Sequence, residues 1–188
     1  MKSSLSQREI LFFRLLLALA LIVLAAALRV APHPWNFTPI GAMALFSGAI
    51  VRDRRIAFLF PLLALFAGDL FAGLYNFKVM LVVYASFLLS VMIGRLLKRR
   101  RTVPRLAGAT FLSALQFFLI TNFAMWCLYN TYPKTAAGLA ACYLNGLPLF
   151  WNTLAGDAVY VAVLFLGYGL AEGMLPTLRE SAQRVSTK

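Results

Sequence analysis

The sequence has few of the side chains on which soluble enzymes and metalloproteins depend. Its 188 residues include six acidic side chains, two cysteines and one histidine, and only 13% of the residues are charged. The cysteines, Cys127 and Cys142, form no CxxC pair, and with one histidine they do not supply a usual zinc site. HExxH and GxxxxGKS/T are also missing, so the chain encodes neither that metalloprotease helix nor that nucleotide-binding loop.

Apolar residues make up most of what remains. The chain is 62% hydrophobic, with a mean hydropathy of +0.81. A helix needs about 20 apolar residues to cross the hydrocarbon layer of a membrane. The sequence therefore predicts an all-α membrane protein with one domain over residues 1–188. Six transmembrane helices are expected, at Ile10–Leu28, Thr38–Val51, Ile56–Tyr75, Val79–Leu97, Leu106–Leu128 and Phe150–Leu170.

The positive charges indicate the orientation of these spans. If both termini are cytoplasmic, the outer segments contain only Arg29, Lys78 and Lys134, and every other lysine and arginine lies in an inner segment. This distribution follows the positive-inside rule and predicts a multi-pass membrane protein with both termini in the cytoplasm. The run KRRR at 98–101 is then a topology signal, and no nucleic-acid partner is expected.

Three segments do not fit a simple transmembrane helix of full length. The second span is short for a membrane crossing, so it starts earlier, tilts or is shielded by its neighbours. Thr135–Leu147 is moderately apolar but too short to cross, so we expect an outer loop with a re-entrant or interfacial helix. The triplet AAA at 25–27 resembles a signal-peptide cleavage site. The apolar run before it is long and carries Arg14, which favours a retained helix.

Amide and aromatic side chains gather on the predicted outer side. All three tryptophans and six of the seven tyrosines lie there. An interfacial aromatic belt is one explanation, but belts normally form at both faces, and a buried amide needs hydrogen-bond partners. The pattern favours a polar, aromatic-lined recess that opens outward. All six asparagines are on this side: Asn36, Asn76, Asn122, Asn130, Asn145 and Asn152.

Two acidic residues fall inside predicted spans. Asp69 and Asp157 each follow Ala-Gly, on helices that run in opposite directions, which resembles the inverted repeats of some transporters. Intramembrane carboxylates are costly and often functional. The alternative for each is a structural role, as a helix cap or in a salt bridge, for example to Arg29.

The segment 29–49 joins the first two spans. Pro32 and Pro34 prevent helix continuation, and His33, Trp35 and Asn36 are expected near the mouth of the recess. The alternative is a plain interfacial turn in which His33 is only hydrogen-bonded.

Two motifs suggest a family. HPWNFTPIGAMALFSGA and PLLALFAGDLFAGLYN, with the short basic loop between them, resemble the S components of energy-coupling-factor (ECF) vitamin transporters. The chain is most similar to the solitary cobalamin transporters of the BtuM type. The resemblance implies a multi-pass protein of the bacterial inner membrane that has a six-helix S-component fold and an outward-opening pocket. It also implies that the transported ligand is a vitamin, cobalamin. It leads us to expect Asp69, Phe77, Met80 and Tyr84 in the pocket, with His33, Trp35, Asn36, Asn122 and Asp157 around it.

The chain departs from that type at the expected cobalt ligand. A cysteine is expected near the start of the fourth span, but the sequence there is NFKVMLVVYASF. Met80 is a candidate axial ligand through its soft thioether, with packing as the alternative reading. His33, Cys127 or Cys142 are possible substitutes.

The sequence also bears on whether the protein needs an ECF module and on which other functions compete with cobalamin uptake. The AxxxA pattern of module-dependent S components fails through most of the first span, which favours solitary action in the bilayer over an ECF energising module. One alternative function is an S component for another vitamin or precursor. Another is an intramembrane aspartyl-type hydrolase that uses Asp69 and Asp157, although its GxGD element is incomplete. A third is an accessory subunit that only packs against a partner.

Overall fold

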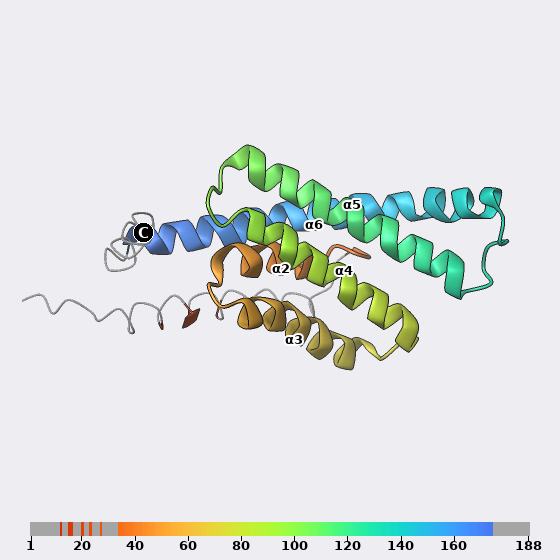
Figure 1. Cartoon of the computed structure of the whole chain (residues 1–188), viewed down its shortest axis with the longest axis horizontal. Helices are drawn as coiled ribbons and strands as arrows, with labels where there is room; N and C mark the ends of the chain where they lie inside the picture. The colour runs from red at the N-terminus through yellow and green to blue at the C-terminus, as the bar shows by residue number, and fades with distance from the viewer. Residues whose placement is uncertain are drawn as a thin grey trace, which may run out of the picture.

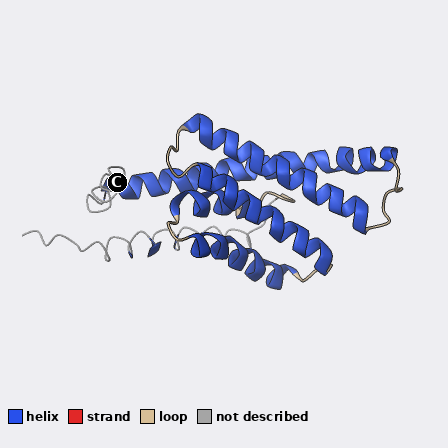
Figure 2. Cartoon of the chain, in the orientation of Figure 1, coloured by secondary structure: helices blue, strands red, loops and turns tan. Residues whose placement is uncertain are grey.

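The computed structural model describes residues 34–174 and the isolated positions 12, 15, 16, 20, 23 and 27. Every regular element in this part of the chain is a helix, which confirms the all-α class (Figures 1 and 2). The predicted first span, Ile10–Leu28, and the cleavage-site question lie almost entirely outside the described residues. The helices are α2 (Ile40–Ile50), α3 (Arg54–Ala72), α4 (Phe77–Leu96), α5 (Val103–Leu128) and α6 (Ala136–Met174).

Three of these helices are long and apolar enough to cross a membrane. They are Phe77–Leu96, Val103–Leu128 and Ala136–Gly173. Helix α3 has 19 residues, but it begins with Arg54 and Arg55 and contains Asp69. The predicted spans coincide with α2, α3, α4 and α5 to within a few residues at each end.

The expected helix within Thr135–Leu147 is present. The expectation of a separate outer segment is wrong, because α6 runs unbroken through that stretch into the sixth span and has 39 residues. Pro148 lies inside the helix and removes one backbone donor without ending it. Helix α5 supplies the surface that holds this extension, since the Tyr143 hydroxyl donates to the Leu119 carbonyl at 2.8 Å. At 1.5 Å per residue α6 is roughly 59 Å long, about twice the thickness of the hydrocarbon layer.

Helix α2 is the centre of the bundle. It has only 11 residues, roughly 17 Å by helical rise, and all of them except Ile50 are buried. It packs against α3, α4, α5 and α6, and Phe46 meets the rings of Phe165 and Tyr168 edge-on. Of the three alternatives for the short second span, which were an earlier start, a tilt and shielding by neighbours, the structure shows the shielding.

Two glycines bring α2 and α4 into backbone contact. A Cβ added to Gly48 would overlap the Val91 carbonyl oxygen, and one added to Gly94 would overlap the Leu45 carbonyl oxygen. Small residues at helix crossings permit this approach in membrane proteins. Neither position can accept a side chain unless the two helices separate.

The basic residues collect at one end of the bundle. The α2–α3 loop, the α4–α5 loop and the end of α6 lie together on the left in Figure 1, while the α3–α4 and α5–α6 connections lie on the right. The two basic loops touch, since the Lys98 ammonium donates to the Arg52 carbonyl at 3.3 Å. We call these the basic end and the opposite end.

Substituting Gly48 or Gly94 by alanine tests the packing of α2 against α4. Each change forces a methyl group into a backbone carbonyl, so we expect a loss of about 1–3 kcal/mol of stability. Gly108→Ala is the matched control, because no atom lies within 4 Å of a Cβ added at Gly108. Thermal unfolding in detergent measures the effect, and an equal response of all three variants would contradict the packing.

Candidate ligand site

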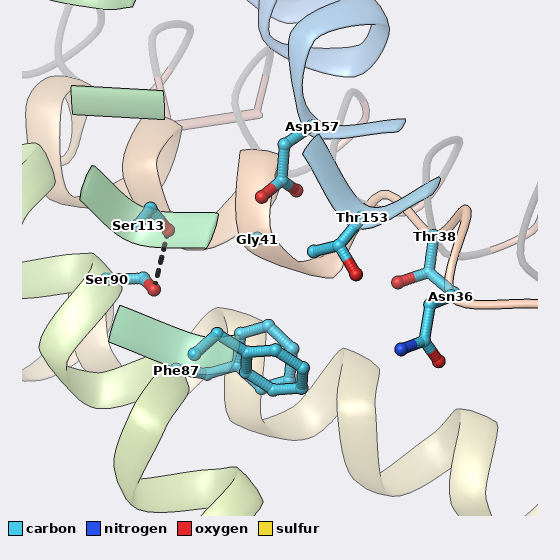
Figure 3. Close-up of a pocket in the computed structure, with 9 residues that line it drawn as sticks. Asn36, Thr38, Gly41, Phe87, Ser90, Ser113, Thr153 and Asp157 are labelled. Atoms are coloured by element: carbon cyan, nitrogen blue, oxygen red, sulfur yellow. Dashed lines mark hydrogen bonds between the residues drawn. The ribbon is translucent and has the colours of Figure 1, made fainter. Parts of the chain in front are cut away.

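A small polar cavity lies where α2 begins, between α2, α4, α5 and α6. Its volume is about 40 Å³, enough for roughly three water molecules. Figure 3 shows hydroxyl, amide and carboxylate groups around it, with the ring of Phe87 on one side. The lining residues are Asn36, Thr38, Gly41, Phe87, Ser90, Ser113, Phe117, Thr153 and Asp157.

Asp157 closes the cavity against the N-terminus of α2. Its side chain is 2% exposed, and its carboxylate lies against the first turn of α2, at Gly41 and the backbone N–H of Ala42. The N-cap residue of α2 is Pro39, which provides no side-chain cap. A carboxylate at a helix N-terminus satisfies free N–H groups and the helix dipole. Asp157 thus caps α2 from another helix, which supports the structural role that the sequence left open.

Gly41 makes room for that carboxylate. A Cβ added to Gly41 would overlap both carboxylate oxygens of Asp157. A glycine is therefore required at position 41, because the Asp157 carboxylate approaches the α2 backbone too closely to leave room for a Cβ.

A hydroxyl and amide network continues from the cavity into the bundle. The Ser113 hydroxyl donates to the Ser90 hydroxyl at 2.8 Å. The Gln116 amide nitrogen donates to the Ser90 hydroxyl and to the Ser86 carbonyl, both at 3.0 Å. The Gln116 Oε1 atom is buried and has no hydrogen-bond partner in the part of the chain that the structure describes. Sequence reasoning missed this network, although four polar residues at helical spacing within two apolar spans were a usable signal.

Asp69 belongs to a different contact. Its carboxylate, 2% exposed, accepts a hydrogen bond from the Tyr84 hydroxyl at 2.9 Å, which joins α3 to α4. Met80 lies one turn before Tyr84 and is partly buried, and Phe77, the first residue of α4, is 69% exposed. The two predicted carboxylates therefore lie in different places, Asp69 in the contact with Tyr84 and Asp157 at the cavity.

Four of the six predicted outer asparagines make structural hydrogen bonds. The Asn122 amide donates to the Phe118 carbonyl at 2.9 Å, and its side chain packs where Gly146 has no Cβ. Trp35 is 84% exposed, and its carbonyl accepts from Asn152 at 3.0 Å. Only Asn36 among the asparagines lines the cavity. His33 and Arg29 lie outside the described residues.

Metal-binding groups are sparse in the described part of the chain. No group of three His, Cys, Asp or Glu side chains comes together among residues 34–174. Both cysteines are free thiols, with Cys127 exposed and Cys142 buried. The Cys142 thiol donates to the Asn122 carbonyl at 3.4 Å, which favours a packing role between α5 and α6.

A double-mutant cycle tests the cap formed by Asp157. Gly41→Ala should destabilise the native protein, because the new methyl group displaces the carboxylate. In an Asp157→Ala background the same change should cost less, with a coupling of about 0.5–3 kcal/mol. Thermal unfolding of the four proteins measures this coupling, and simple additivity would contradict the proposed contact.

The comparisons with known proteins place the chain in a family without assigning an activity. The profile of a family of unknown function, DUF6580, matches residues 10–178. No curated protein and no solved structure matches the chain. Because the match covers most of the sequence, the chain belongs to the DUF6580 family.

Proposed function

We propose that this chain is a six-span protein of the bacterial inner membrane, with cytoplasmic termini, that takes up a vitamin from the outside. Cobalamin is the first ligand to test, and another vitamin or precursor is the second. The observation that carries the proposal is the half-length helix α2, whose N-terminus ends inside the bundle beneath a polar cavity. Transporters commonly place ligand sites at the ends of such short helices.

The distribution of charge supports the orientation. The described cations outside the basic end are Lys78 and Lys134, at the starts of α4 and α6. The positive-inside rule then puts the basic end in the cytoplasm. The first residues of α2 and the cavity therefore face the outer half of the bilayer, where a ligand from the periplasm would arrive.

The chemistry of the cavity suits a ligand rich in amide or hydroxyl groups. Thr38, Thr153 and Asn36 offer both donors and acceptors near its mouth, and Phe87 and Phe117 offer apolar faces (Figure 3). Cobalamin carries amides around its corrin ring, and other vitamins carry hydroxyl or amide groups. This combination of aromatic walls with a few convergent polar groups is typical of ligand sites.

The size of the cavity requires a conformational change on binding. Pockets for ligands of this class have volumes of roughly 300–1,000 Å³, far above the 40 Å³ of this cavity. Among the described helices, α3 packs only against α2 and α4. We therefore expect α3, which carries Asp69, to move outward when a vitamin enters.

The first test is the absorption spectrum of protein purified from cells grown with cobalamin. We expect the visible absorption of a corrin to co-purify with the protein and to disappear after exhaustive exchange into cobalamin-free buffer. Met80→Leu should shift this spectrum only if the thioether binds cobalt. If cobalamin does not bind, thermal stabilisation by a panel of smaller vitamins tests the second ligand class. If none of them stabilises the protein, the uptake proposal is wrong.

A matched pair of threonines tests the site itself. Thr153 and Thr121 each donate to the carbonyl four residues earlier, at 2.9 Å and 2.7 Å, but only Thr153 lines the cavity. For whichever vitamin binds, Thr153→Val should raise the dissociation constant about tenfold, as expected for a lost hydrogen bond. Thr121→Val should leave it unchanged. Calorimetric titration measures both, and equal effects would show that the ligand binds elsewhere.

A further inference from the structure

The two loops at the basic end, the α2–α3 loop and the α4–α5 loop, are rich in positive charge. Residues 52–55 and 95–105 contain nine lysines and arginines and one acid, Asp53. The Asp53 carboxylate caps α3, because it accepts a hydrogen bond from the Ile56 backbone N–H at 3.0 Å. The positive charge of these two loops therefore far exceeds the negative charge within the same two loops.

Three of these cations are drawn together by the fold. The Lys98 ammonium donates to the Arg52 carbonyl at 3.3 Å, which joins the α2–α3 loop to the α4–α5 loop. Burial, followed by the charges of Arg95 and Arg52, lowers the pKa of Lys98. Like charges at close range repel one another, so this arrangement becomes more stable when an anion binds between them.

The guanidinium group of Arg95 is a second indication that an anion binds here. Its Nη1 atom is buried and has no hydrogen-bond partner within the described residues. A buried guanidinium nitrogen without an acceptor is costly. Arginine also matches the geometry of phosphate oxygens through paired N–H groups.

The surroundings of these cations favour a lipid over a soluble anion. Leu96 is 76% exposed and Val103 is 79% exposed, at the two ends of the α4–α5 connection. A membrane phospholipid can place its phosphate on the cations and its acyl chains against such residues. Basic clusters at the cytoplasmic end of membrane helices recognise anionic lipids in this way.

We propose that Arg52, Arg95 and Lys98 form a binding site for the phosphate of an anionic membrane phospholipid. The site joins the α2–α3 loop to the α4–α5 loop at the end of the bundle where α2 and α4 are in backbone contact. It is independent of the cavity at Asp157 and of the ligand proposed for it.

The test is thermal unfolding of the full chain in detergent with added phosphatidylglycerol, phosphatidylcholine or inorganic phosphate. We expect phosphatidylglycerol to raise the melting temperature by at least about 3 °C. Phosphatidylcholine and inorganic phosphate at equal concentration should have little effect. Stabilisation by inorganic phosphate equal to that by phosphatidylglycerol would overturn the lipid assignment.

Paired variants separate a defined site from general attraction. Arg95→Gln with Lys98→Gln should abolish most of the phosphatidylglycerol effect. Arg100→Gln with Arg105→Gln removes the same charge from exposed positions and should preserve it. If both pairs lose the effect equally, the site is wrong. Native mass spectrometry of the unsubstituted protein gives a second measurement that does not depend on folding of the variants. Retention of phosphatidylglycerol over phosphatidylcholine supports the site, and equal retention contradicts it.

Discussion

The described bundle depends on the burial of one short helix. An α-helix leaves backbone N–H groups free at its start and carbonyl groups free at its end, and in an apolar environment each unpaired group is costly. Helix α2 begins inside the bundle, where its first residues are buried. Water alone therefore cannot pair the free backbone N–H groups at its start. The fold meets this need with Asp157 from α6 at the start of the helix. Near the other end the Ser47 hydroxyl donates to the Ala57 carbonyl of α3 at 2.9 Å. This bond serves α3, because Pro61, four residues after Ala57, has no N–H to donate to that carbonyl.

The polar cavity is a consequence of that arrangement. Because α2 covers only about half of a membrane thickness, the space beyond its first residues is filled by the 34–39 segment and by side chains of α4, α5 and α6. Several of these side chains are polar, and their hydrogen bonds reach as far as Gln116. A small polar space inside an apolar bundle is the feature on which the proposed ligand binding depends.

The two ends of the bundle have different chemistry. At the basic end, cations crowd together beside exposed apolar residues, as expected where helices leave a membrane toward an anionic surface. At the opposite end, amides and aromatic rings fix loops and helix ends, as when Asn76 caps α4 through the Lys78 backbone N–H. The asymmetry of the asparagines therefore has two sources, since Asn36 lines the cavity and several others stabilise local structure.

The sequence alone determined the helical class, most of the helix boundaries and the grouping of basic residues, because hydropathy and charge are local properties of the chain. It also indicated that Asp69 and Asp157 are buried, since both fall inside apolar runs. Only the tertiary structure decided that residues 135–147 continue into α6, because the surface that supports this helix comes from α5. It also decided that Asp157 meets Gly41, that Asp69 meets Tyr84 and that Trp35 and Asn122 lie away from the cavity. Those contacts join residues far apart in the chain, and no local pattern specifies which helices become neighbours.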